Sequence, residues 1–255
     1  MTPGRVLVTR AAAQAGELVS AMREAGLSPV EVPTITVEID RPRGRLDAAA
    51  GSLHTYHWVV VTSGNGARAI LKAAERTLTE LGAPSWAAIG PATRQILERE
   101  GIEVAFQPSR STGVAMAAEL PIVRGDRVLV LRGDLADPKL AATLRARGAE
   151  VDDIVAYRTS EAPGASRELL RTATADGSIA AVVFTSGSTI GGLLRLGQAE
   201  SIDVRSFPAV CIGPETADEA RAAGFRILAI SPTPTAAALA AATANALALQ
   251  PEEIS

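Results

Sequence analysis

Hydroxyl-bearing residues and glycines follow nearly every apolar run in this chain. The run at 58–61 leads into Thr62-Ser63-Gly64-Asn65, and the run at 179–184 leads into Thr185-Ser186-Gly187-Ser188. The others are Thr9-Arg10, Gly90-Pro91-Ala92-Thr93, Ser109-Arg110-Ser111-Thr112, Arg132-Gly133, Gly213-Pro214-Glu215-Thr216 and Ser231-Pro232-Thr233. At a helix start, such segments expose free backbone N–H groups and a partial positive charge, which bind carboxylates or phosphates. For any single loop an ordinary N-cap is the simpler interpretation, but eight such loops together favour anion binding.

The same motifs occur twice at a nearly constant offset. Thr62 and Thr93 return as Thr185 and Thr216, in both cases 123 residues later, and Arg10 returns as Arg132 after 122 residues. A constant offset over several motifs indicates two duplicated halves. Two similar halves predict a cleft between them, which is the expected place for a ligand.

Tyr157 is the best candidate for proton transfer. It lies in Val155-Ala156-Tyr157-Arg158-Thr159, inside a long extended stretch. A phenol that points into a cleft can donate a proton, with Arg158 supplying positive charge. An edge-strand tyrosine with its hydroxyl in water is an equally good interpretation of the residues alone.

Other motifs carry less chemistry. The residues at 64–69 fit the Gly-x-Gly-x-x-Gly/Ala pattern of dinucleotide sites, but no acidic residue ends the next strand and the repeat drops the pattern. His54 and His57 precede Trp58 without clustered carboxylates, which disfavours a metal site. Cys211, the single cysteine, lies in an apolar run and is expected to be a buried, inert thiol. The residues therefore predict neither a metal nor a cofactor.

Composition excludes several classes of protein. The 255 residues are 47% hydrophobic, 21% charged and carry a net charge of −3, so nothing points to nucleic acid or an acidic membrane. No signal peptide is evident, and the alanine-rich stretch at 235–249 is too short and weakly apolar to span a bilayer. A cytoplasmic enzyme or binding protein is expected.

Short β-branched runs alternate with helical patterns, which indicates parallel α/β layers. Strands are expected at 5–9, 29–39, 58–61, 86–89, 104–106, 128–131, 151–157, 179–184, 208–212 and 227–230. Helices are expected at 14–24, from about 64 to 78, from 91 or 92 to 101, from about 113 to 120, at 138–147, after 184, up to 223 and over 235–249. The extended stretches at 33–40 and 155–163 are interpreted as linkers between lobes. The sequence alone allows either that discontinuous division or two contiguous halves split near residue 122.

Taken in order, these motifs resemble the uroporphyrinogen-III synthase family. The resemblance is carried by Val6-Leu7-Val8-Thr9-Arg10, Val61-Thr62-Ser63-Gly64-Asn65-Gly66, Leu131-Arg132-Gly133, Ala156-Tyr157-Arg158-Thr159, Phe184-Thr185-Ser186, Ile212-Gly213-Pro214-Glu215-Thr216, Ala223-Gly224 and Ser231-Pro232-Thr233. It implies an α/β fold with two similar three-layer α/β/α domains, parallel sheets and a two-stranded linker. The discontinuous division then follows, with one lobe at 1–34 plus 161–255, the other at 40–154, and linkers at 34–40 and 154–161. Ala11 stands where the family often has proline.

The resemblance also implies the reaction. Hydroxymethylbilane, supplied by hydroxymethylbilane synthase, would lose water and close to uroporphyrinogen III with ring D inverted, catalysed by a monomeric lyase without metal or cofactor. Tyr157 would be the catalytic residue. The loops would bind the substrate through Thr9, Arg10, Thr62, Ser63, Gly64, Asn65, Thr93, Ser111, Thr112, Arg132, Gly133, Thr185, Ser186, Gly187, Ser188, Gly213, Pro214 and Thr216. Two alternatives are a two-lobed carboxylate-binding protein without catalysis and an NAD(P)-dependent oxidoreductase.

Overall fold

The computed structural model describes residues 4–249, which fall into two compact units. The first unit comprises the described residues up to Thr36 and those from Ser160 onward, and the second unit is Val37–Thr159. The chain passes from one unit to the other within β3 (Ile35–Ile39) and within β8 (Glu150–Glu161).

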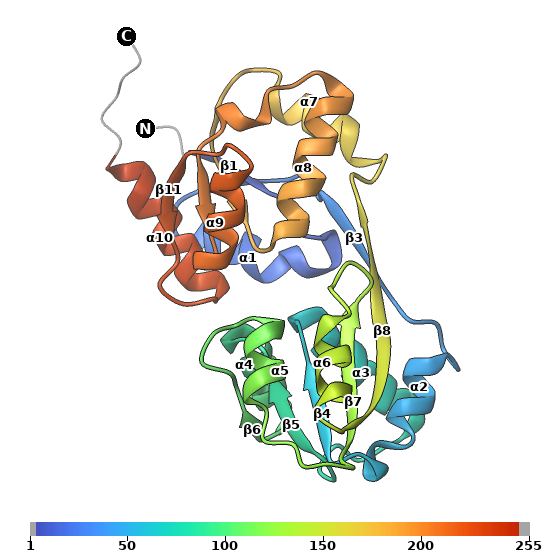
Figure 1. The fold of residues 1–255 in the computed structure, drawn as a ribbon. Coiled ribbons are helices and arrows are strands. Elements are labelled where there is room, and N and C mark those ends of the chain that lie inside the picture. Colours follow the sequence, from blue (N-terminus) through green and yellow to red (C-terminus); the bar gives the residue numbers. More distant parts are fainter. Residues whose placement is uncertain (1–3, 250–255) are drawn as a thin grey trace. The chain divides into compact units, whose positions relative to one another are not determined.

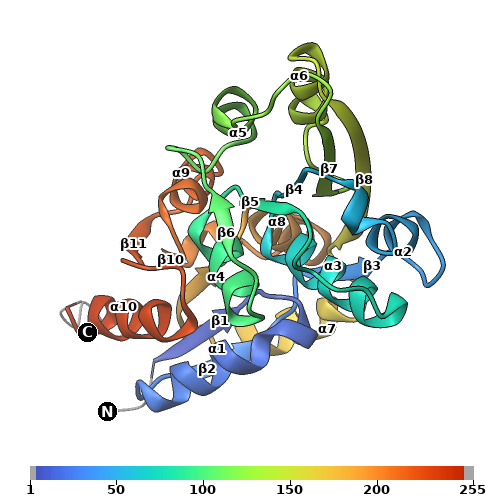
Figure 2. The ribbon, with the colours of Figure 1, turned by 90° about the horizontal axis from the view of Figure 1, so that it is seen from below.

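The first unit is a five-stranded parallel sheet covered on both faces by helices (Figure 1). Its strand order is β11-β10-β9-β1-β2. The strands are β1 (Arg5–Val8), β2 (Ser28–Glu31), β9 (Ile179–Phe184), β10 (Ala209–Cys211) and β11 (Ile227–Ile230). One face packs against α7 (Ser166–Thr174), α8 (Gly187–Glu200) and α9 (Pro214–Ala222), and a 3₁₀ turn lies at Val204–Ser206. The other face packs against α1 (Ala12–Glu24) and α10 (Ala236–Ala248), which contact each other (Figure 2).

The second unit has the same layered construction around a six-stranded sheet. Its strand order is β3-β8-β7-β4-β5-β6, and β4 to β8 run parallel. The remaining strands are β4 (Trp58–Val61), β5 (Ser85–Ala88), β6 (Val104–Phe106) and β7 (Arg127–Gly133). One face packs against α2 (Arg45–Ala50), α3 (Gly64–Thr77) and α4 (Pro91–Arg99), with a 3₁₀ turn at Leu53–Thr55. The other face packs against α5 (Gly113–Glu119) and α6 (Lys139–Ala146).

The apolar runs are continuous because these strands are buried on both faces. In β4, Val59 and Val61 belong to the core under α2 to α4, whereas Val60 belongs to the core under α5 and α6. Trp86 fills the first of these cores and donates its indole N–H to the carbonyl of Leu81 at 2.9 Å. The predicted α/β class is confirmed.

The repeated sequence motifs occupy matching places in the two sheets. The order β11-β10-β9-β1-β2 corresponds strand for strand to β6-β5-β4-β7-β8. Thr62 thus follows the central strand β4, and Thr185 follows the central strand β9. The two halves related by the sequence repeat therefore have the same strand order.

The structure differs from the sequence expectations in several segments. The stretch expected to be extended over 29–39 is divided at Val32, Pro33 and Thr34, so that β2 and β3 belong to different sheets. The stretch expected to be a linker at 154–161 begins inside the second sheet, because the pairing with β7 continues as far as Tyr157. Helices α2 and α7 were not predicted. Among the described residues, no helix is long and apolar enough to cross a membrane.

Candidate functional site

In the second unit the carboxyl ends of β4, β5 and β7 share one edge of the sheet, because these strands are parallel. Three predicted site residues meet there. The Tyr157 hydroxyl lies 2.9 Å from the Ser63 Oγ, and its ring packs against Gly133. A Cβ at position 133 would lie 2.7 Å from the Tyr157 hydroxyl oxygen and Cζ, so only glycine leaves the ring its present place.

A β-bulge determines where Tyr157 points. Arg132 in β7 pairs with Val155, but the next residue, Gly133, pairs with Tyr157, which leaves Ala156 as the extra residue. Such a bulge re-aims the side chains that follow it. As a result Tyr157 packs against the same core as Ala156, the core that also contains residues of α3. This places its hydroxyl at the N-terminus of that helix.

The Ser63 hydroxyl contacts both the backbone of α3 and Tyr157. Ser63 is the N-cap of α3, with extended backbone, and its Oγ accepts a hydrogen bond from the Gly66 N–H at 3.1 Å. The same oxygen contacts the Tyr157 hydroxyl. The Gly66 N–H, the Ser63 Oγ and the Tyr157 hydroxyl are therefore linked by consecutive hydrogen bonds at the start of α3.

The environment of Tyr157 keeps its phenol protonated. Burial raises the pKa of Tyr157 above its usual range, the hydrogen bond to Ser63 lowers it, and the nearby Asp134 carboxylate raises it. The group is therefore neutral at physiological pH and retains a proton that it can donate.

Two other expected residues of the second unit have structural partners. The Arg132 guanidinium pairs with Asp153 through contacts of 2.8 and 3.1 Å and donates to the carbonyls of Gly133 and Ala136. The Thr62 hydroxyl donates to the Leu131 carbonyl at 3.0 Å. The Thr62 bond joins the carboxyl ends of β4 and β7, and the Arg132–Asp153 pair joins β7 to β8.

The remaining loops of the second unit adjoin the same edge. Gly90 is the N-cap of α4, and a Cβ there would lie 3.3 Å from the Ser111 Oγ, so the loops after β5 and β6 approach closely. Thr112 is the N-cap of α5 and accepts from the Ala115 N–H at 3.2 Å. Gly64 and Asn65 begin α3.

In the first unit the corresponding loops follow β1, β9 and β10. Thr9 is fully buried and donates to the Val183 carbonyl at 2.7 Å, which gives it a structural role, and Arg10 follows it. Ser186 is the N-cap of α8, and its Oγ lies 3.0 Å from that of Ser188. Thr185 is partly exposed at the end of β9.

Thr93 and Thr216, which are related by the repeat, share an unusual position. Each lies in the first turn of a helix after a glycine N-cap and a proline, at Gly90-Pro91 and Gly213-Pro214. They are 5% and 8% exposed, and neither hydroxyl has a hydrogen-bond partner within the described residues. Since no buried side-chain oxygen of the described residues lacks a hydrogen-bond partner, both hydroxyls reach solvent, where a ligand can contact them.

A carboxylate of the protein itself lies at the start of α8. A Cβ on Gly187 would overlap the Glu219 carboxylate, which would then have to move aside. Burial raises the pKa of Glu219, and burial and the charge of Glu219 raise that of Glu215. Sequence reasoning missed the roles of Glu219 and Asp134, because neither belongs to a repeated motif and only the register of the elements reveals their neighbours.

The other candidates for chemistry have ordinary environments. Within residues 4–249, no group of three His, Cys, Asp or Glu side chains could hold a metal ion. Burial raises the pKa of the Cys211 thiol to about 11, so it is an inert core residue as predicted. His57 accepts a hydrogen bond at Nδ1 from the Arg127 N–H at 3.0 Å. No acidic residue lies in β5, the strand that follows the 64–69 motif.

Comparisons with known proteins agree with one another. A family model described as "Uroporphyrinogen-III synthase HemD" matches residues 16–241. The "Porphyrin biosynthesis protein HemD" of Ruminiclostridium josui is 27% identical over 232 residues, which cover 87% of this chain but only 44% of that protein. The "Uroporphyrinogen-III synthase" of Synechococcus elongatus is 25% identical over 224 residues, covering 83% of each chain. A mutant uroporphyrinogen III synthase from Thermus thermophilus has a related fold, with a TM-score of 0.70, 20% identity, and coverage of 97% of this chain and 100% of that one.

Proposed function

Because the chain belongs to the uroporphyrinogen-III synthase family, we propose that it converts hydroxymethylbilane to uroporphyrinogen III, with inversion of ring D and loss of water. This makes it a cyclising lyase. The observation that carries the proposal is the contact between Tyr157 and Ser63 at the edge of the second sheet where β4, β5 and β7 end.

The first chemical step is loss of the terminal hydroxyl. Tyr157 donates its proton to that oxygen as the carbon–oxygen bond breaks, and water leaves. The raised pKa of Tyr157 ensures that the proton is present, although it makes the phenol a weak acid. A weak acid suffices because hydroxymethylbilane already closes slowly without an enzyme, and general acid catalysis typically contributes about 10²–10⁴-fold.

The choice of isomer depends on holding the substrate in one geometry. The uncatalysed reaction gives the product without inversion, so the protein must position the terminal ring before the bond forms. Hydroxymethylbilane carries eight carboxylates. We assign several of these to helix N-termini and loop hydroxyls, with Thr93 and Thr216 as the best supported contacts because their hydroxyls reach solvent and have no hydrogen-bond partner among the described residues.

The variant Tyr157→Phe tests this proposal against a binding protein without catalysis. We expect turnover to fall by about 10²-fold or more, whereas affinity for uroporphyrin, a stable octacarboxylate, stays within about 2-fold of the wild type. Ser63 keeps its capping bond to Gly66 in this variant, so the fold is retained. If the wild-type protein binds uroporphyrin but neither it nor the variant accelerates ring closure, the chain is a binding protein and the proposal is wrong.

A further inference from the structure

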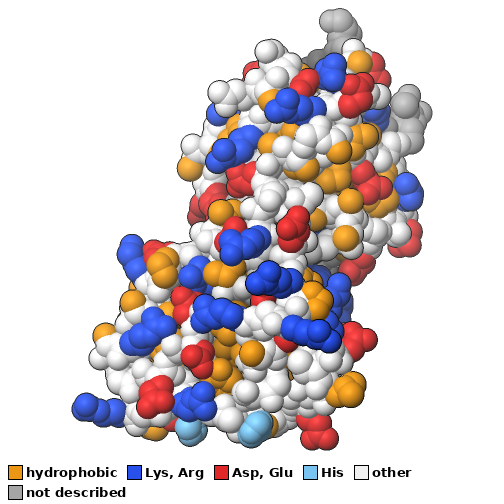
Figure 3. Space-filling model, turned by 90° about the vertical axis from the view of Figure 1, so that its right-hand side faces the viewer, with side chains coloured by type: hydrophobic (Ala, Val, Ile, Leu, Met, Phe, Trp, Pro, Cys, Tyr) orange, Lys and Arg blue, Asp and Glu red, His pale blue; other side chains and the backbone are white. Residues whose placement is uncertain are grey.

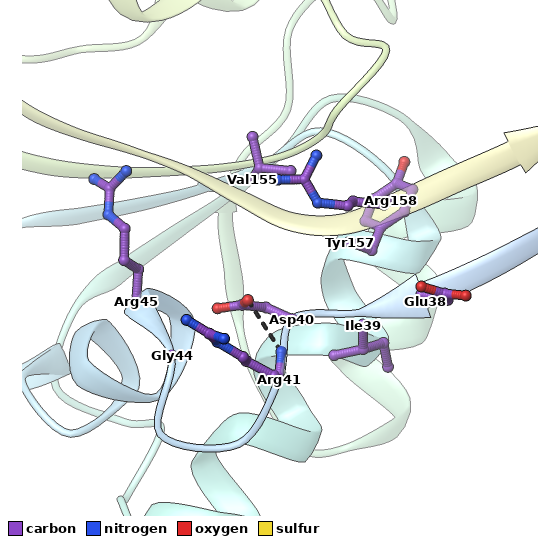
Figure 4. A pocket seen from close by; sticks show the side chains of 9 residues that line it. All are labelled: Glu38, Ile39, Asp40, Arg41, Gly44, Arg45, Val155, Tyr157 and Arg158. Atoms are coloured by element: carbon purple, nitrogen blue, oxygen red, sulfur yellow. Dashed lines mark hydrogen bonds between the residues drawn. The ribbon is translucent and has the colours of Figure 1, made fainter.

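A pocket of about 470 Å³ lies at the β3 edge of the second unit. Its walls come from β3, from the loop and first turn of α2, and from β8 (Figure 4). The volume is within the range of small-molecule sites, about 300–1,000 Å³. Tyr157, the proposed proton donor, forms part of its wall, but the proposed function gives no role to Arg41 or Arg45.

Three arginines line this pocket. Arg41 and Arg45 come from the segment that begins α2, and Arg158 comes from β8, so their guanidinium groups reach the space from different sides (Figure 4). Two other arginines of the same unit are neutralised by partners, Arg76 by Asp47 and Arg132 by Asp153. Among the described residues, none of the three pocket guanidinium groups has an ion pair or side-chain hydrogen bond.

The acidic residues of the pocket do not cancel this charge. The Asp40 carboxylate accepts hydrogen bonds from the backbone N–H groups of Arg41 and Leu46, at 3.0 and 3.1 Å, and thereby holds the loop before α2. Glu38 is exposed on β3. Three guanidinium groups against two carboxylates leave the pocket positive, although the whole chain carries −3. Figure 3 shows basic side chains gathered on this part of the second unit.

The rest of the wall is apolar. Ile39, Val155 and Tyr157 contribute it, and each of them is only partly buried. A ligand that suits these walls has an apolar body and carboxylates that extend from it toward the arginines. Guanidinium groups bind carboxylates well because the planar fork matches their two oxygens.

We propose that this pocket binds a pair of carboxylates carried on one small scaffold, with Arg41, Arg45 and Arg158 as their counter-ions. Two sources share this chemistry, namely one pyrrole ring of the tetrapyrrole with its acetate and propionate arms, and a separate small polycarboxylate. A ligand that joins Arg158 to Arg45 ties β8 to α2, on the strand that also carries Tyr157. For the pyrrole ring the inference rests on the proposed function and assigns the two arms of one ring to the arginines; for a separate polycarboxylate it goes beyond that function.

Two probes test the site, uroporphyrin and citrate, each titrated into wild-type protein and into the double variant Arg45→Gln/Arg158→Gln. If a tetrapyrrole ring occupies the pocket, the dissociation constant for uroporphyrin rises about 10-fold in the variant, from two exposed ion pairs that each contribute about 3-fold. Added salt should reduce this ratio, because exposed charges are screened. If a separate polycarboxylate occupies it, citrate binding is lost in the variant and uroporphyrin binding is unchanged.

Arg99→Gln is the matched control, because Arg99 is an exposed arginine of the same unit at the end of α4, outside the pocket. It should leave the affinity for both probes unchanged. Equal affinities in the wild type, the double variant and the control, for both probes, would overturn the inference. Because each arm measures binding, an absence of ring-closing activity would refute the proposed function and leave this result standing.

Discussion

Gly133→Ala should reduce catalysis far more than it reduces stability. The added Cβ would lie 2.7 Å from Cζ and from the hydroxyl oxygen of Tyr157, whereas ordinary contact begins at 3.4 Å. The ring must therefore move by about 0.7 Å, which disturbs the 2.9 Å contact with Ser63. Since a misplacement of about 1 Å can cost about 10²-fold in rate, we expect kcat to fall about 10- to 100-fold, or about 1.4–2.7 kcal/mol.

The cost in folding free energy should be small. The atoms that the new methyl group meets are at the far end of a side chain, which can swing away, so we expect a loss of about 1 kcal/mol at the low end of overpacking effects. The assays are the initial rate of uroporphyrinogen III formation and urea unfolding. Gly82→Ala is the control, because a Cβ at Gly82 meets nothing within 4 Å.

A double-mutant cycle sharpens this test. If Gly133→Ala acts by displacing the phenol, it should lower kcat only slightly further in the Tyr157→Phe variant, where the hydroxyl is already absent. Wild-type kcat in folded Gly133→Ala, or fully additive losses in the double variant, would refute the reasoning that places the reacting proton on Tyr157.

Two further predictions follow from the same environment and from the core. Ser63→Ala removes both the N-cap of α3 and the partner of Tyr157, so it should lower the free energy of unfolding by about 1 kcal/mol and also lower kcat. Thr235→Ala removes only the N-cap of α10, so it should lower the free energy of unfolding without changing kcat. Equal kcat values in the two variants would contradict this prediction. Burial raises the pKa of Cys211 from 9.0 to about 11. The thiol is neutral in both the folded and the unfolded chain below about pH 9, so its full contribution to the free energy of unfolding is present there. As the pH rises through 11 this contribution of about 2–3 kcal/mol is lost, because the thiol ionises more readily in the unfolded chain. Urea unfolding at pH 8 and pH 11 should show a smaller loss in Cys211→Ala than in the wild type, and an identical loss would exclude the thiol as the cause.

The layered fold was predictable because it is encoded in local patterns. The run at Trp58–Val61 and its repeat at Ile179–Phe184 are buried on both faces and read as continuous apolar strands. Helix α2 was missed because its polar surroundings hide a short alanine-rich turn. Helix α7 was missed because its buried residues, Leu170 and Ala173, form a narrow stripe in a polar segment.

The site was predictable only in part. A repeated motif identified Ser63, and the extended stretch at 155–163 identified Tyr157, but their contact depends on the bulge at Ala156, and no pattern in the sequence fixes the register of β8 against β7. The same limit applies to Arg132, whose position in a loop motif suggested a ligand contact, whereas the structure pairs it with Asp153. Partners far apart in sequence follow from tertiary packing, which spacing alone does not reveal.

The product isomer tests the central claim most directly. Hydroxymethylbilane would be generated in situ and incubated with the purified protein without added metal or cofactor, and the oxidised products would be separated by chromatography. The account predicts that the type III isomer predominates, in contrast to the type I isomer that forms without enzyme. Type I isomer alone, from protein shown to be folded, would contradict the account.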